Sequence, residues 1–189
     1  EALIFCDKII NRGAYYSSEE NREIECVTVY PSNYKHSDIR AWLNGTFYSA
    51  AFSATEQSGI KITTVDNSAA TTSLSTNTYV CENTQDKIFL LSNRDMYNTS
   101  YGFIADGTES DPERMLLVSD YARAIGAHTS DSIAWAGCGI WWARSPMHDD
   151  ATVVDSGSMS GMVSSSKVTS AQVGIAPAMR VSASAVTII

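Results

Sequence analysis

The sequence has few basic residues and no cluster of them. Its 189 residues include 13 Lys or Arg against 21 Asp or Glu, which gives a formal net charge of −8. Nucleic-acid binding depends on Lys and Arg side chains that neutralise phosphates, so this charge disfavours a nucleic-acid partner. It disfavours an anionic membrane surface for the same reason. Apolar runs are also short, none of them approaching the roughly 18 residues that cross a bilayer, so we expect no membrane insertion.

Cysteine is scarce and widely spaced. Cys6, Cys26, Cys81 and Cys138 form no Cys-x-x-Cys pair, which argues against a structural zinc site. Each has apolar or aromatic neighbours, which favours buried free thiols that act as small hydrophobic side chains. A Cys6–Cys26 disulfide is the alternative, although a chain of this length does not need a disulfide to fold.

The sequence also lacks the common catalytic motifs. It has no phosphate-binding glycine loop, no Gly-x-Ser-x-Gly turn and no His-Glu-x-x-His pair, and His36, His128 and His148 lie far apart in the chain. We therefore predict no catalytic residues and no cofactor. One enzymatic alternative is a nucleophilic Cys138 with His128 or His148 as its base.

The residues that are present predict an α+β domain. Hydrophobic residues make up 44%, enough for a packed core, and charged residues only 18%. Ser37 or Asp38 is a good N-cap, and the residues that follow at helical spacing are Ile39, Trp42, Leu43, Phe47 and Ala51. We expect two or three helices packed on small, mostly antiparallel sheets with long loops.

Other segments predict shorter elements. Ser53 and Glu56 match a capping box, and 120–125 reads as a short helix that ends at Gly126. The expected strands are 2–10, 60–65, 86–92, 139–145, 151–155 and 174–181. No linker divides the chain, so we expect a single domain over residues 1–189. Because the chain opens on Glu1 and enters an apolar segment at once, we expect it to be a fragment of a longer surface or secreted protein.

The most informative segment is the strand that contains Trp141 and Trp142. Neighbouring side chains on a strand point to opposite faces, so one indole faces the core, and the other, on the side of Arg144, faces a second layer or solvent. In the structural interpretation the strand is covered on both faces and Arg144 braces a loop carboxylate such as Asp155. In the functional interpretation Trp142 and Arg144 form the floor of a ligand site, because a flat apolar ring and planar donors suit sugars and peptides.

The loop after this strand supplies the other candidate ligand-binding residues, His148, Asp149 and Asp155. Oxygen-rich loops of this kind can hold calcium, but the spacing of an EF-hand is absent. We therefore predict no metal site here.

Several segments together resemble a bacterial family, the domain of unknown function 6273, which is common in Gram-positive gut bacteria. The matching segments, in chain order, are 39–47, 51–53, 63–65, 84–92, 121–122, 126–127, 141–146 and 173–179. Two positions depart from the family pattern: Ala143 stands where the family usually has Leu, and Ala176 where it has Arg.

Part of this pattern is similar to the core of C-type-lectin-like domains. The run Trp-Trp-x-Arg-Ser at 141–145, ahead of Gly-x-x-Pro-Ala at 174–178, carries the similarity, and the formylglycine-generating enzymes are the nearest type. The resemblance implies a C-type-lectin-like fold that binds ligands on its loop side. The calcium-dependent sugar motifs of true C-type lectins are absent, and the paired active-site cysteines of the enzymes have no counterpart.

We therefore expect a non-catalytic ligand-binding module for adhesion or recognition, located outside the cell or on its surface. Its ligand would be a glycan or a protein, bound by the loops 147–155 and 164–172. One alternative is a formylglycine-generating-like oxidoreductase that uses Cys138. The other is a structural spacer in a larger protein.

Overall fold

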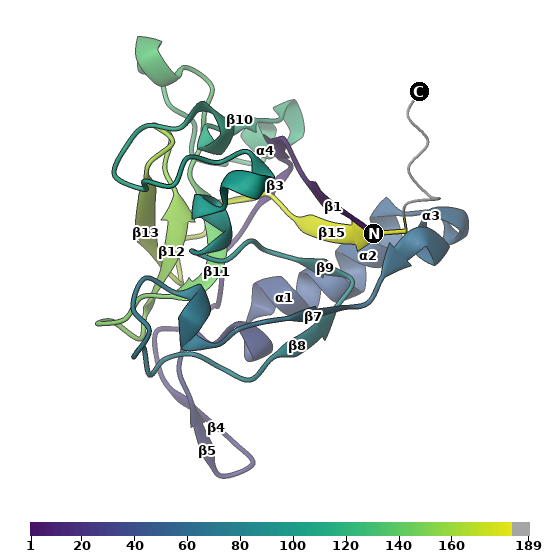
Figure 1. The fold of residues 1–189 in the computed structure, drawn as a ribbon, viewed down its shortest axis with the longest axis vertical. Coiled ribbons are helices and arrows are strands. Elements are labelled where there is room, and N and C mark those ends of the chain that lie inside the picture. Colours follow the sequence, from purple (N-terminus) through teal and green to yellow (C-terminus); the bar gives the residue numbers. More distant parts are fainter. Residues whose placement is uncertain (183–189) are drawn as a thin grey trace.

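The first and last strands of the described chain lie side by side. The structure is a computed structural model that describes residues 1–182, so the final part of the expected domain, 183–189, lies outside the described residues. One sheet consists of β1 (Ala2–Phe5), β15 (Ala178–Val181), β6 (Ile60–Lys61) and β9 (Ile88–Phe89). β15 is its centre, with β1 antiparallel on one side and β6 and β9 antiparallel on the other (Figure 1).

A second sheet carries Trp141 and Trp142. Its strand order is β13 (Val163–Lys167), β12 (Val153–Gly157), β11 (Trp141–Pro146), β14 (Gly174–Ile175) and β3 (Asn11–Arg12). Only the β11–β14 pairing is parallel in this sheet. Every residue of β11 is buried, so the prediction of a doubly covered strand is confirmed.

Three two-stranded pairs complete the strands. They are the hairpin of β4 (Arg22–Ile24) and β5 (Val27–Val29), the antiparallel pair of β7 (Thr63–Val65) and β8 (Thr84–Asp86), and the parallel pair of β2 (Lys8–Ile9) and β10 (Leu117–Val118). The β4–β5 hairpin projects from the body of the molecule (Figure 1). Its turn residues Glu25 and Cys26 both have positive φ, 51° and 64°.

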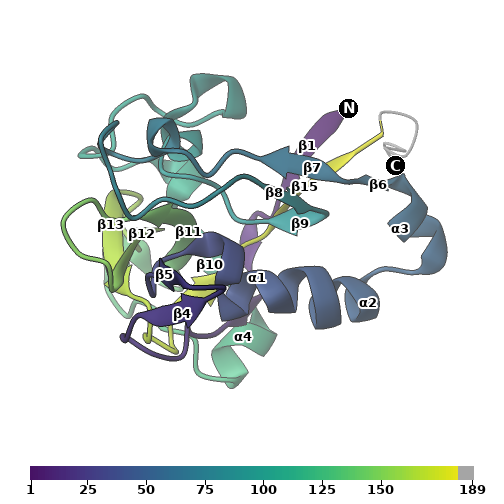
Figure 2. The same ribbon diagram turned by 90° about the horizontal axis from the view of Figure 1, so that it is seen from below.

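The predicted helix over 38–51 is confirmed. α1 (Asp38–Trp42), the π-helical turn η2 (Leu43–Phe47) and α2 (Tyr48–Ala51) follow one another without a break (Figure 2). The side chain of Ser37 accepts a hydrogen bond from the N–H of Arg40 and caps the helix. Ile39 and Leu43 are buried in the core.

The remaining helices are short. α3 (Ala54–Gly59) begins with the predicted capping box of Ser53 and Glu56, and α4 (Asp120–Ala124) ends before Gly126, whose φ is 93°. The 3-10 helices are η1 (Tyr34–His36), η3 (Ala69–Thr71), η4 (Asp95–Tyr97), η5 (Thr99–Tyr101), η6 (Pro112–Arg114) and η7 (Ile133–Trp135). The α+β class predicted from the sequence is therefore confirmed.

The predicted strands are shorter or interrupted: 2–10, 60–65 and 174–181 are each divided into two, and the strands predicted at 139 and 151 begin at 141 and 153. The apolar run 86–92 forms strand only as far as Phe89, although Leu90 and Leu91 are also buried. Their carbonyls are bound by Arg144, which donates from its guanidinium to Leu90 (2.7 Å) and from its main-chain N–H to Leu91 (2.8 Å). These bonds from a residue of β11 satisfy the carbonyls of Leu90 and Leu91 although neither residue belongs to a strand.

Both tryptophans are fully buried. Trp141 donates its indole N–H to the carbonyl of Arg114 (3.0 Å), and Trp142 donates to that of Gly13 (2.8 Å). The ring of Trp142 packs edge-on against Tyr15, with centroids 5.6 Å apart. Of the two environments expected for the second indole, the structure shows a second packed layer and not solvent.

Candidate functional site

The outer edge of β1 has no pairing strand in the described part of the chain. Main-chain groups alternate in direction along an antiparallel strand. The N–H of Cys6 donates to the carbonyl of Pro177 (3.0 Å). The main-chain N–H and C=O groups of Ile4 and Cys6 therefore point toward β15, whereas those of Leu3 and Phe5 point away from it. Within residues 1–182, nothing hydrogen-bonds to the outward main-chain groups of Leu3 and Phe5.

The chain that follows β1 enters a separate pair of strands. β2 pairs in parallel with β10, and the N–H of Ser119 donates to the carbonyl of Ile9 (2.9 Å). The carbonyl of Ile9 therefore has a partner, whereas the outward main-chain groups of Leu3 and Phe5 have none within residues 1–182.

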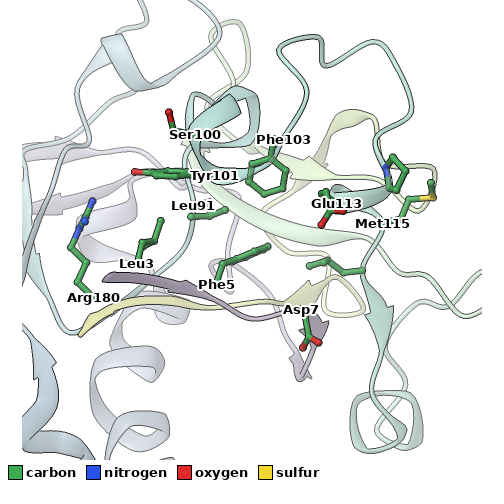
Figure 3. Close-up of a pocket in the computed structure, with 12 residues that line it drawn as sticks. Leu3, Phe5, Asp7, Leu91, Ser100, Tyr101, Phe103, Glu113, Met115 and Arg180 are labelled. Atoms are coloured by element: carbon green, nitrogen blue, oxygen red, sulfur yellow. The ribbon is translucent and has the colours of Figure 1, made fainter. Parts of the chain in front are cut away.

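A groove of about 630 Å³ lies over the face of β1 and β15 that carries the side chains of Leu3, Phe5 and Arg180, and we call it the edge groove (Figure 3). Its apolar lining is Leu3, Phe5, Leu91, Tyr101, Phe103, Pro112, Met115 and Leu116, and its polar lining is Asp7, Ser100, Glu113 and Arg180. Leu3 and Phe5 rise from β1 toward Leu91, Tyr101 and Phe103 (Figure 3). The groove thus lies between β1 and the long connection that ends at β10.

The floor of the edge groove rests on the buried indole of Trp141. The ring of Phe5 lies 5.4 Å from that of Trp141 and 6.2 Å from that of Phe103, centroid to centroid. On the far side of the indole, Gly157 leaves no room for a Cβ atom. Because Trp141 is enclosed and hydrogen-bonded, it fixes the position of Phe5.

The wall of the edge groove is held by Arg114, whose side chain is fully buried. Its guanidinium donates to the carbonyls of five residues, at distances between 2.7 and 3.2 Å. These residues are Met96, Ile104, Asp106, Glu109 and Gly161. The long connection 93–111 has little regular structure, and this one side chain supplies donors to four of its carbonyls.

Asp111 completes this arrangement. One of its carboxylate oxygens lies 3.4 Å from the guanidinium of Arg114 and accepts the N–H of Ile104 (2.9 Å). The other oxygen accepts the N–H of Glu113 (3.0 Å) and caps η6. These contacts hold Arg114 in place. Its two neighbours in the chain, Glu113 and Met115, line the edge groove.

The edge groove has opposite charges at its two ends. Arg180 lies at one end, and Asp7 and Glu113 lie toward the other (Figure 3). Arg180 is half-buried and lies on β15 directly opposite Leu3 of β1. Among residues 1–182, its guanidinium takes part in no ion pair.

A second hollow of about 260 Å³ extends the groove beyond Arg180. It shares the side chains of Leu3, Leu91, Tyr101 and Arg180 with the edge groove. Its further lining includes two more arginines, Arg94 and Arg144, and two acids, Asp66 and Asp95.

The structure places Arg144 in a bracing role, but with a different carboxylate from the one expected. It binds Asp95 (2.9 Å) and the carbonyls of Leu90 (2.7 Å) and Asp66 (3.1 Å), and it is only 6% exposed. The expectation that Asp155 is its partner is wrong, because Asp155 accepts its hydrogen bond from the amide of Asn93 (2.9 Å).

The five predicted ligand-binding residues do not share one surface. Trp142 is in the core, and Asp155 is buried, which raises the pKa of its carboxyl to about 7. His148 and Asp149 are exposed on the loop between β11 and β12. A ligand role for the exposed pair stays a prediction.

Cys138 lies in a setting that disfavours a reactive thiolate. Its side chain is buried, and desolvation raises the pKa of the thiol. All four cysteines are free, which corrects the alternative of a Cys6–Cys26 bridge. Cys26 is exposed in the hairpin turn, so the expectation that all four cysteines are buried is confirmed only in part.

Two surveys of residues 1–182 add to this description. This part of the chain holds no cluster of three or more His, Cys, Asp or Glu residues suited to a metal ion. It also holds no helix that combines the length and the apolar character needed to cross a membrane.

The sequence pattern did not identify the edge groove. Its residues come from 3–7, 91–116 and position 180, which meet only in the folded chain. One signal was available: Arg180 is the lone charge in an otherwise apolar strand at 178–181. An arginine in such a strand indicates either a buried partner or a ligand.

One family matches almost the whole described chain. The family is described as Domain of unknown function (DUF6273), and the match covers residues 2–183. No curated protein and no solved structure matches the chain. Because the match covers nearly its full length, the chain belongs to the domain of unknown function 6273 family.

Proposed function

We propose that this chain is a non-catalytic ligand-binding module of a bacterial surface or secreted protein, and that the edge groove binds its ligand. One observation carries the proposal. A groove large enough for a ligand combines a rigid apolar floor with Arg180, an arginine that forms no ion pair within residues 1–182. Ligand sites are typically concave, mostly apolar and supplied with a few fixed polar groups.

The chemistry of the surrounding groups supports a binding role over an enzymatic one. The buried ionisable side chains in this region make structural contacts: Arg114 and Arg144 bind loop carbonyls, and Asp155 is bound to Asn93. Cys138 lies on a different segment from the groove lining, and its thiol is kept protonated by burial.

We also propose that the architecture is C-type-lectin-like. Three features support this: the pairing of β1 with β15, the continuous helix over 38–51 beside a small sheet, and the long connections between 93 and 140. In such a fold the long loops form the binding side, and here a long connection forms the wall of the edge groove.

Binding screens with the purified domain test the proposal. A glycan array and a pull-down from culture supernatants and cell-wall extracts cover the two ligand classes, glycans and proteins. Captured ligands are then measured against Arg180→Glu and Phe5→Ala, which alter the groove, and against the double variant His148→Ala, Asp149→Ala as a matched surface control.

The outcomes separate the alternatives. Loss of binding in the groove variants alone supports the edge groove. Loss in the surface control alone would move the site to the loop between β11 and β12. No ligand in either screen would contradict a binding module and favour a structural spacer. Rapid labelling of Cys138 by iodoacetamide, together with copper uptake by the domain, would favour the oxidoreductase.

A further inference from the structure

We infer that the ligand of the edge groove is an extended segment of another protein, which adds as a strand to the open edge of β1. This inference rests on the proposed function and deepens it. An acidic side chain of the segment would bind Arg180, a basic one would bind Asp7 or Glu113, and apolar residues would lie between them.

The main chain of β1 supplies the first part of the argument. Leu3 and Phe5 present their N–H and C=O groups away from β15 while their side chains line the groove, and they are two residues apart, which is the repeat of a pairing strand. Main-chain bonds to an exposed edge are how several domains bind extended peptides.

The sequence of β1 supplies the second part. Natural proteins protect open sheet edges with Lys, Pro, bulges or inward-pointing charges. β1 is Ala-Leu-Ile-Phe, paired in regular register with β15, and carries none of these. An unprotected apolar edge beside a groove indicates an edge that is used for pairing.

Both faces of β1 offer apolar contact, which is the third part. Leu3 and Phe5 line the edge groove, whereas Ile4 and Cys6 line an apolar hollow of about 230 Å³ on the other face. Ile4 is 38% exposed. Side chains of an added strand alternate between the two faces, so apolar residues in succession would find partners on both.

The charges define the ligand further and favour a peptide over a glycan. Arg180 is level with Leu3, and Asp7 lies four residues further along the same chain. A bound strand advances about 3.3 Å per residue, so its acidic and basic side chains should be about four residues apart. The net charge of −8 opposes acidic ligands in general, and Arg180 is the basic residue in the lining of the edge groove.

The probe is a displayed library of random twelve-residue peptides, selected on the immobilised domain. We expect the selected peptides to share apolar residues between an acidic and a basic position. Fluorescence anisotropy with one such peptide should show a loss of about ten-fold in affinity for Arg180→Glu, as for a charge pair worth roughly 1.4 kcal/mol. The same peptide with its acidic residue replaced by Lys should recover affinity for that variant.

Strand addition itself is tested by a matched pair of variants. Leu3→Ala removes the side chain and keeps the N–H, whereas Leu3→Pro also removes the outward N–H. Proline is tolerated at this position because the N–H has no partner in the sheet. We expect Leu3→Pro to bind about three- to ten-fold more weakly than Leu3→Ala, as for one lost main-chain hydrogen bond.

Hydrogen exchange gives a reading that does not depend on affinity. In the complex, the amides of Leu3 and Phe5 should become protected. Peptides that bind without this protection, and equally well to both Leu3 variants, would overturn strand addition while leaving the proposed function intact. Binding of glycans alone would do the same. No binding of either class would instead contradict the proposed function.

Discussion

Replacing Arg114 tests whether one buried side chain holds the wall of the edge groove. In Arg114→Met, a side chain of similar length keeps much of the apolar packing, and five carbonyls lose their donor. A hydrogen bond to a charged group contributes about 1.5–3 kcal/mol. A sum over five bonds would overstate the effect, because burying the guanidinium has its own cost.

The net effect should match that of breaking other buried charge networks. Removing one partner of a buried ion pair costs about 3–5 kcal/mol, and we expect a loss of this size for Arg114→Met. It would be a large part of the total stability of a domain, which is about 5–15 kcal/mol. With a urea dependence of about 2 kcal/mol per molar, the unfolding midpoint should fall by roughly 2 M.

Urea titrations followed by tryptophan fluorescence measure this loss. The matched control is Arg123→Met, the same exchange at an exposed position on α4, which should change stability by less than about 0.5 kcal/mol. Arg114→Lys should lie between the two, since an ammonium has three donors and cannot reach five carbonyls. If Arg114→Met lies within about 1 kcal/mol of the control, the assignment of the wall to this residue is refuted.

Three further changes test other parts of the structure. Gly157→Ala should lower the free energy of unfolding by about 1–3 kcal/mol because its Cβ would overlap the indole of Trp141. In the control Gly45→Ala, the added Cβ meets no atom within 4 Å, so the change should be neutral or stabilising. Equal losses of the two variants in urea titrations would contradict this packing. Burial raises the pKa of Asp155 to about 7, so the folded protein keeps a proton that the unfolded chain loses above about pH 4, and stability falls as the pH rises from about 4 to 7. The free energy of unfolding of Asp155→Asn, relative to that of the wild type, should therefore increase by about 2–4 kcal/mol as the pH rises from about 5 to about 8. A difference that stays constant in urea titrations across that range would refute the pKa shift. Ser53→Ala should cost about 1 kcal/mol in thermal unfolding through loss of the capping box, and an unchanged melting temperature would show that the box contributes nothing.

Elements that depend on neighbours in the chain could be predicted from the sequence. The helix over 38–51 has its cap and its apolar spacing within one stretch of residues, and the capping box at Ser53 and Glu56 spans four positions. The end of α4 at Gly126 follows from the freedom of glycine to take a positive φ. In each case the stabilising contact and the signal for it lie in the same segment.

The partners of the buried arginines could not be predicted in this way. Arg114 binds the carbonyl of Gly161, 47 positions away, and Arg144 binds that of Asp66, 78 positions away. Every residue has a carbonyl, so nothing in the sequence marks which carbonyls an arginine will bind. The expected Arg144–Asp155 pair failed for a related reason, since Asp95 and Asp155 are equally plausible carboxylates until the chain is folded.

The same two arginines explain how irregular segments can form the proposed binding site. A loop that orders only when its ligand arrives loses affinity to the entropy of ordering. In the wall of the edge groove that cost is met during folding, because Arg114 fixes carbonyls between 96 and 109 and Arg144 fixes Leu90 and Asp66. Side chains that point into the groove make none of these bonds, so the lining can change while the wall keeps its shape. In the proposed site, recognition would therefore depend on the lining residues, and the geometry in which they are presented depends on Arg114 and Arg144.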